Sequence, residues 1–156
     1  MARRRRAEKR VAPPDPRFNS GELSTFINHV MMRGKKTVAQ RIVYEALEQV
    51  ERETHRDPVE VFGLAMRNVT PNVEVKARRV GGATYQVPIE VEGSRRTSLA
   101  IRWLMAAARA RTGRPMRDKL AQELVDASRG QGAAVRRREE LHKTAEANRA
   151  FVHYRW

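Results

Sequence analysis

The sequence has no cysteine and no long apolar run, and both absences limit what the chain does. Without Cys, none of its 156 residues forms a disulfide or a thiolate metal site, which fits a reducing compartment. No apolar stretch approaches the ~18–20 residues that span a membrane. The basic N-terminus lacks the apolar segment of a secretory signal. We therefore expect no membrane partner, and the length suits one domain with a real core.

Catalytic motifs are also missing. The four histidines are scattered without an HExxH pair, and neither a Gly-x-Ser-x-Gly elbow nor a thiol nucleophile occurs. Residues 34–37 resemble the end of a phosphate-binding loop, but the first glycine of a Walker motif would fall at His29. Glu123 and Asp126 share one helix face, which we interpret as ordinary solvated surface rather than a metal site. We expect no enzyme activity, cofactor, metal or small-molecule substrate.

Acidic residues are too few to balance the basic ones. The chain holds 32 Lys and Arg against 18 Asp and Glu, a formal net charge of +14. Such a compact body repels itself unless a polyanion lies close by. Arg greatly outnumbers Lys, and its planar guanidinium binds phosphate through two hydrogen bonds. The charge therefore favours a nucleic-acid partner, and only residues 37–70 are acidic on balance.

Periodicity and capping signals predict a mainly α fold with one projecting β-hairpin. Capping patterns begin at Asn19, Thr37 and Asp57, and glycines or prolines end most of the apolar helical stretches. We expect residues 1–17 to form a flexible basic arm, 18–150 a single domain and 151–156 an aromatic, basic tail. The six predicted helices cover about residues 21–32, 36–53, 58–70, 97–111, 115–129 and 133–150.

The period changes to two at about residues 72–91. Apolar and polar residues alternate on both sides of Gly81 and Gly82, which predicts a hairpin with a two-residue turn. Pro88 cannot lie in a central strand, so we expect free edges. An isolated two-stranded ribbon is marginal in water, and this one carries cations near its tip. We expect an arm that is ordered best when it lies on RNA or DNA.

Several clusters of cations are candidates for phosphate contact, each weighed against an ordinary solvated surface. Lys35 and Lys36 lie where one predicted helix ends and the next begins, so helix-start N–H groups and two ammonium groups converge there. Further cations flank the hairpin tip or follow the fourth predicted helix. Arg136 to Arg138 are consecutive, so they do not share one helix face and part of that run is expected to pair with Glu139 and Glu140.

Four aromatic residues raise the same question of packing against base stacking. We interpret Trp103 as a core residue because it lies near an apolar helical stripe. Tyr85 either packs across the hairpin or stacks on RNA. Tyr154 and Trp156 either stack on bases or pin the tail to the body, and the sequence does not decide between these.

Four blocks resemble the family of ribosomal small-subunit protein seven. They are residues 20–46, with the run Ser-Gly-Glu-Leu-Ser-Thr-Phe-Ile-Asn-His-Val-Met-Met-Arg-Gly-Lys-Lys, and then 78–88, 100–104 and 145–151. The four arginines at 3–6 and the ending His-Tyr-Arg-Trp also fit a bacterial member. The resemblance covers the whole chain and is highly specific.

The resemblance implies a six-helix bundle with an extended β-ribbon and a cytoplasmic, ribosomal location. It implies direct, early binding to the 3′ major domain of 16S ribosomal RNA and nucleation of the small-subunit head. It also implies that the ribbon tip and last helix approach the exit-site transfer RNA and the messenger RNA path. Neighbouring head proteins and the platform's eleventh protein are the expected protein partners.

Carried onto this chain, the resemblance and the charge pattern assign two sets of residues. The set expected near transfer RNA is Val80, Gly81 and Gly82, with Lys143 as a weaker candidate. The set expected to hold ribosomal RNA is Arg3, Arg4, Arg5, Arg6, Lys9, Arg10, Lys35, Lys36, Lys76, Arg78, Arg79, Arg95, Arg96, Arg102, Arg111 and Arg114.

Two other classes of function remain open from the residues alone. A DNA-binding architectural protein would also be basic with a β-arm, and it would be expected to bind as a dimer with two arms in DNA grooves. An enzyme acting on nucleic acid would need a cluster of carboxylates that binds a metal ion, and a lack of metal-dependent turnover would exclude it. A preference for structured RNA over duplex DNA would distinguish a ribosomal protein from a DNA-binding architectural protein.

Overall fold

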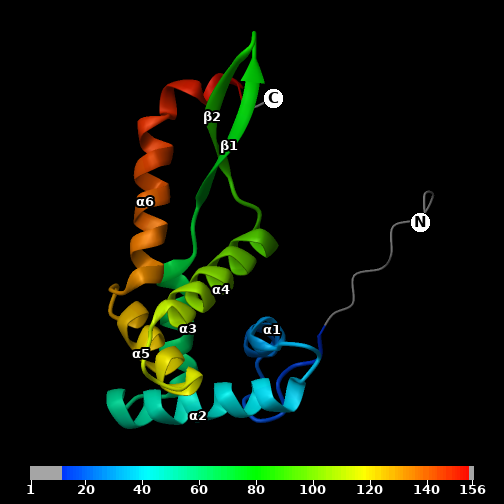
Figure 1. Ribbon diagram of the computed structural model, residues 1–156, viewed down its shortest axis with the longest axis vertical. Coiled ribbons are helices and arrows are strands. Elements are labelled where there is room, and N and C mark those ends of the chain that lie inside the picture. Colours follow the sequence, from blue (N-terminus) through cyan, green and yellow to red (C-terminus); the bar gives the residue numbers. More distant parts are fainter. Residues whose placement is uncertain (1–11, 155–156) are drawn as a thin grey trace, which may run out of the picture.

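The computed structural model describes residues 12–154, which form a helical body with a hairpin and one long helix standing on it (Figure 1). No helix within this part of the chain is long and apolar enough to cross a membrane. The elements are α1 (Gly21–Val30), α2 (Lys36–Thr54), α3 (Pro58–Val69), β1 (Val73–Val80), β2 (Ala83–Glu90), α4 (Gly93–Ala110), α5 (Met116–Ser128), α6 (Ala133–Ala147) and the 3-10 helix η1 (Arg149–Tyr154). The mainly helical fold, with its hairpin between α3 and α4, is confirmed.

The core lies between α1, α2, α3, α4 and α5. Phe26 of α1 and Phe62 of α3 meet edge to face with ring centroids 5.2 Å apart, and both side chains are fully buried. Edge-to-face aromatic pairs stabilise by more than the apolar area they bury. Leu47, Leu104 and Leu120 bring the apolar faces of α2, α4 and α5 to the same cluster. This body is the base from which the hairpin projects.

Helices α1 and α2 begin at the predicted residues, but their predicted capping contacts were wrong. The Oγ of Ser20, not a side-chain atom of Asn19, accepts the Leu23 N–H at the start of α1. Asn19 instead adopts a positive φ of 49° one residue earlier. At α2 the N-cap is Lys35 and no side chain caps the helix, so the predicted Thr37 capping box does not form. At α3 the predicted N-cap is confirmed. The Asp57 side chain accepts the Val59 N–H, and Pro58 is the first residue of the helix.

The ends of three helices also differ from the prediction. Helix α1 stops at Val30 rather than near residue 32. Helix α4 begins at Gly93, one turn before the predicted start, so Arg95 and Arg96 lie in its first turn instead of preceding it. Helix α6 ends at Ala147, and η1 covers most of the predicted tail.

The hairpin has the predicted two-residue turn. Val80 pairs with Ala83, and the two glycines between them have φ values of 57° and 91°. A turn with two positive φ values matches the right-handed twist of the strands, and glycine adopts it without strain. The alternation was less regular than predicted, because Glu74 of β1 is buried while Val73 and Val75 are only partly so.

The hairpin does not stand alone. Helix α6 runs beside β1, and η1 folds back over β2 (Figure 1). The ring of Tyr85 on β2 lies 5.1 Å from that of Phe151 and 5.3 Å from that of Tyr154. The C-terminal segment therefore supplies the packing partner that a two-stranded ribbon needs for stability in water.

The start of the described chain is tied to α2. The buried carboxylate of Asp15 accepts the Tyr44 hydroxyl at 2.6 Å and the backbone N–H groups of Arg17 and Phe18. Burial and the bond to Asp15 raise the pKa of the Tyr44 hydroxyl to about 12. Part of the segment predicted to be a flexible arm is thus held on the body. The predicted phosphate contacts at Arg3, Arg4, Arg5, Arg6, Lys9 and Arg10 lie outside the described residues.

Candidate nucleic-acid interface

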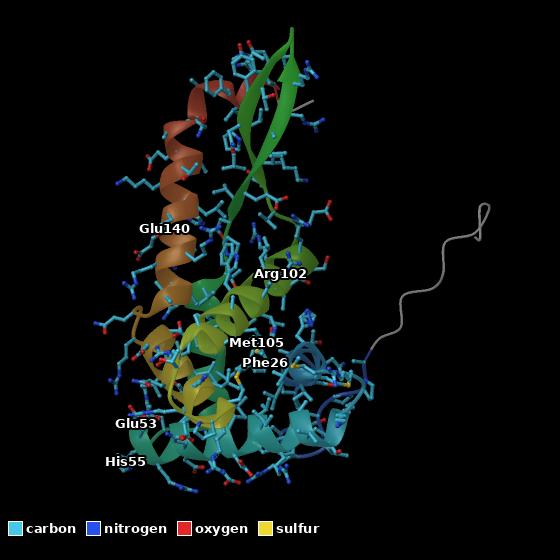
Figure 2. The ribbon with its side chains drawn as sticks, viewed as in Figure 1. Phe26, Glu53, His55, Arg102, Met105 and Glu140 are labelled. Carbon is cyan, nitrogen blue, oxygen red and sulfur yellow. The ribbon has the colours of Figure 1, made fainter. Side chains whose placement is uncertain are left out.

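A row of cations follows one face of α4. Arg95, Arg102 and Arg109 are seven residues apart, so they repeat every second turn at intervals of about 10 Å. All three side chains are exposed, and Arg102 and Arg109 pair with no carboxylate of residues 12–154. Figure 2 shows Arg102 on α4 above Met105 and Phe26, which both belong to the core cluster. This face offers positive charge over three turns or more of a rigid helix.

Arg102 also reaches the end of α1. Partial burial, and then the positive charge of Arg102, lower the pKa of the His29 imidazole. His29 is therefore neutral at pH 7, and the positive charge here comes from Arg102.

The turn between α1 and α2 adds a second group of cations next to this row. Lys35 and Lys36 are exposed, and neither pairs with a carboxylate in the described chain. Lys35 and Arg109 line the same groove of about 450 Å³, whose floor is apolar. No side chain caps the first turn of α2, so N–H groups there have no side-chain acceptor next to the two exposed lysines.

Arg109 was left out of the final set of residues expected to hold ribosomal RNA, although the structure brings it to the same groove as Lys35. The signal in the sequence was its spacing of seven residues from Arg102, which places both arginines on the same face of one helix.

The hairpin carries the third group. Arg78 and Arg79 are exposed, opposite Tyr85 and Thr84, and pair with no carboxylate among residues 12–154. Val80 and the two turn glycines form the tip beyond them. The tip lies at the end of the molecule opposite α2 (Figure 1). The predicted cations therefore form an extended surface rather than one compact patch.

Two of the predicted phosphate-binding cations share a carboxylate at the base of the hairpin. Arg95 donates from Nε to both oxygens of Glu74, at 3.0 and 2.8 Å, and Lys76 Nζ lies 3.2 Å from the same carboxylate. Burial alone raises the pKa of Glu74, but the hydrogen bonds from Arg95 and Lys76 outweigh it and the net pKa is lowered. This contact joins β1 to the first turn of α4, and half of each cation stays exposed.

Among the predicted cations within residues 12–154, Arg111 is the most strongly engaged. Its Nη2 lies 2.6 Å from Glu123 and 2.6 Å from Asp126, and its Nε donates to Glu123 at 3.0 Å. The interpretation of Glu123 as solvated surface was wrong, because its side chain has no exposed area. Packing of α5 against α3 and α4 turns that helix position inward, which helix periodicity alone does not reveal.

The remaining predicted cations differ in their surroundings. Arg114 is exposed in the loop between α4 and α5, and Lys143 is exposed on α6. Arg96 is half-buried and donates from Nε to the Val91 carbonyl at 2.8 Å. On α6, Arg137 pairs with Glu140 at 3.5 Å and Arg138 with Glu139 at 3.6 Å, as the sequence led us to expect.

The aromatic side chains are mostly engaged within the protein. Trp103 packs against the core, as predicted. Tyr85 and Tyr154 pack on each other, which decides the two open questions in favour of internal contacts in this structure. Trp156 lies outside the described residues. Within residues 12–154 no group of three or more His, Asp or Glu side chains is placed to hold a metal ion.

The fold and its surface define a class of protein: a small, strongly basic helical scaffold with cations displayed along a helix, a turn and a hairpin. The sequence profile described as Ribosomal protein S7p/S5e matches residues 2–149. The chain is 58% identical over 154 residues to the small ribosomal subunit protein uS7 of Thermotoga maritima, covering 99% of each chain. It is also 58% identical over 156 residues to that of Maricaulis maris, covering all of both chains.

The chain therefore belongs to the S7p/S5e family of ribosomal proteins. The predicted resemblance is confirmed. Because the family consists of structural ribosomal proteins, the prediction that the chain is not an enzyme is confirmed as well.

Proposed function

We propose that this protein is a structural component of the small ribosomal subunit, in the cytoplasm, that binds the 3′ major domain of 16S ribosomal RNA and nucleates assembly of the subunit head. The observation that carries the proposal is the extended cationic surface of α4, the α1–α2 turn and the hairpin. Relatives identical at more than half of their positions bear the name small ribosomal subunit protein uS7.

The surface suits a folded RNA better than a single groove of duplex DNA. Its cations lie on elements that diverge from one body, so they meet phosphates of separate RNA segments around a junction (Figure 1). Contacts of this kind position a protein on RNA by shape and charge more than by reading bases. Holding several segments in one arrangement is what nucleation of RNA folding requires.

The hairpin tip and α6 are assigned a second role near the exit-site transfer RNA and the messenger RNA path. The tip residues Gly81 and Gly82 carry no side chains, so an RNA backbone can approach closely. Lys143 offers an exposed ammonium group on α6. Neighbouring head proteins and the eleventh protein of the platform complete the proposed partners.

Binding to the isolated 3′ major domain of 16S RNA, titrated across salt concentrations, tests the proposal. Duplex DNA and an unrelated folded RNA of equal length serve as competitors. We expect binding to the 16S fragment alone to survive both competitors at physiological salt, since non-specific charge contacts weaken steeply with salt. Equal binding to all three nucleic acids would refute the proposal in favour of a general nucleic-acid coat.

A pair of variants tests the cationic surface itself. Replacing both Arg102 and Arg109 with Ala should reduce the salt slope by about 1.4–1.8, because each lost phosphate contact removes about 0.7–0.9. Arg137→Ala is the matched control, since Arg137 already pairs with Glu140 on the outer side of α6. An unchanged slope in the double variant would remove α4 from the RNA-binding surface.

A further inference from the structure

Helix α6 has little apolar surface with which to hold its place. Only Ala134, Val135 and Ala145 of its residues are buried, whereas α4 buries seven apolar residues. Hydrophobic burial scales with apolar area, so two alanines and one valine hold a helix weakly. Yet α6 is the element beside which the hairpin stands (Figure 1). Its position must depend on other contacts.

Polar contacts attach α6 to the body at three levels. At its start, the backbone N–H of Ala134 donates to Glu123 of α5 at 3.0 Å. One turn later, Arg138 donates to the Asn68 carbonyl of α3 at 2.6 Å. Next to the hairpin, the Asn72 N–H donates to Nε2 of His142 at 3.2 Å. The first of these contacts is the only one of the three whose acceptor is a fully buried charge.

Glu123 takes the place of a missing helix cap. The N-cap residue of α6 is Gly132, which has no side chain to accept an N–H from the first turn. Oε1 of Glu123 accepts the Ala134 N–H instead, from a neighbouring helix. A carboxylate at this place also interacts favourably with the positive end of the α6 dipole. A Cβ on residue 132 would lie 2.9 Å from that same Oε1, so the glycine leaves room for the carboxylate.

Arg111 completes the arrangement on the other side. Its guanidinium donates twice to Oε2 of Glu123, which leaves Oε1 for α6. A buried carboxylate without a cation would be costly, and Arg111 supplies the positive charge next to Glu123 inside the protein. Asp126 holds the guanidinium from a second direction, at 2.6 Å.

We propose that Glu123 is a positioning residue that fixes α6, and with it the hairpin, in the RNA-binding arrangement, and that Arg111 serves this carboxylate rather than a phosphate. The part of this inference that concerns RNA rests on the proposed function. The part that concerns α6 is a property of the free protein. The two parts are therefore tested by separate measurements.

Hydrogen exchange of the free protein tests the positioning role. In Glu123→Gln the single amide oxygen is required by the two N–H donors of Arg111, and the amide NH2 then faces the Ala134 N–H, which it cannot accept. We therefore expect exchange in residues 133–154 and in β2 to speed up by roughly 2- to 30-fold, the range that follows from loss of a helix N-cap contact. Amides of α2 and α3 should stay within about twofold of the unaltered protein, because local opening does not require global unfolding. Equal exchange in residues 133–154 of both proteins would overturn the proposal.

A second variant keeps the test decisive if Glu123→Gln folds poorly. Combining Arg111→Met with Glu123→Met removes the cation together with its partner, and replacing a whole buried ion pair by apolar atoms is often neutral. We expect this double variant to be more stable than Glu123→Gln alone while exchange in α6 stays fast. Restored slow exchange in α6 would show that the carboxylate does not hold the helix.

The salt dependence of RNA binding tests the role of Arg111. Arg111→Ala should weaken binding to the 16S fragment while leaving the salt slope unchanged, because no phosphate contact is lost. Arg114→Ala is the comparison variant: it is exposed three residues away, and its loss should reduce the slope by about 0.7–0.9. A comparable reduction of the slope in Arg111→Ala would overturn the assignment of Arg111 to Glu123.

A double-mutant cycle connects the two parts. If Glu123 acts on binding through the hairpin, Glu123→Gln should weaken RNA binding in the full protein but much less in a protein that already lacks Arg78 and Arg79. Identical losses in both backgrounds would contradict a role through the hairpin. If the unaltered protein shows no preference for the 16S fragment, the proposed function fails, and the exchange measurement alone then decides whether Glu123 positions α6.

Discussion

Gly132 offers the sharpest test of how α6 is joined to the body. It has φ 95° and ψ 171°, a conformation that is essentially restricted to glycine. An added Cβ would lie 2.9 Å from Oε1 of Glu123 and 3.2 Å from Cβ of Asp126. Gly132→Ala therefore meets two separate obstacles, one in its own backbone and one in its neighbours.

The expected loss of stability follows from these two obstacles. Backbone strain in such a region costs about 1–3 kcal/mol. Displacing Glu123 from the Ala134 N–H adds about 0.5–2 kcal/mol, the value of a helix N-cap. The free energy of unfolding should fall by about 1.5–5 kcal/mol in total. For a protein of this size the melting temperature changes by about 2–4 °C per kcal/mol, so a decrease of about 3–20 °C is expected.

Thermal unfolding followed by circular dichroism measures this change, with Gly130→Ala as the control. Gly130 also has a positive φ, 74°, but a Cβ there meets nothing within 4 Å. Its substitution should cost only the left-handed backbone conformation, about 1–2 kcal/mol. If Gly132→Ala melts at the same temperature as Gly130→Ala, the contact between residue 132 and Glu123 has no energetic role and the reasoning fails.

Three further changes have expected outcomes. Phe62→Ala should lower the free energy of unfolding by about 3–5 kcal/mol in denaturant titrations, because it leaves a cavity beside Phe26. Tyr85→Ala should speed hydrogen exchange in η1 but not in α2, since it removes both ring contacts of the C-terminal segment. Burial and then Arg138 lower the pKa of His142 below its usual 6.5, so its contribution to stability is complete above that value and is lost as the pH falls through the lowered pKa. Substituting His142 with Gln should remove that part of the pH dependence in melts between pH 8 and pH 5, and an unchanged profile would contradict it.

The elements of the fold could be predicted wherever the signal was local. Asp57 and Pro58 mark the start of α3 through hydrogen bonding and fixed φ, and both act within one turn. Gly81 and Gly82 mark the hairpin turn because few other residues adopt two positive φ values in succession. The start of α4 was missed because this local signal is absent there: Glu92 is the N-cap residue, but its side chain makes no capping hydrogen bond.

The support of the hairpin could not be predicted from periodicity. Tyr85 contacts residues 151 and 154, far along the chain, and only the folded protein brings them together. The alternating pattern indicated a ribbon with free edges but not what covers its face. The same limit applies to Asp15, whose partner Tyr44 lies on another element.

The individual roles of the cations are the part of the candidate site that sequence reasoning could not separate. Net charge is a property of composition, so a value of +14 indicates the class of partner without indicating which side chains meet it. Arg102 and Arg111 look alike in the sequence, yet the first is exposed on α4 and the second holds two carboxylates. The spacing between Arg111 and Glu123 crosses a helix–helix junction, where helical periodicity no longer relates one residue to another.

This difference has a consequence for the salt dependence of binding. The counterions released on binding come from the RNA, and a cation that is shared with a carboxylate neutralises a phosphate less completely, so it contributes less to the slope. Arg95 and Lys76 share Glu74, and Arg111 holds Glu123 and Asp126. The salt slope of the chain should therefore be smaller than the number of its Lys and Arg residues near the interface would give. Substituting Glu74 with Gln should make the slope steeper, because it frees two cations that face the same surface, whereas substituting Glu140 should not.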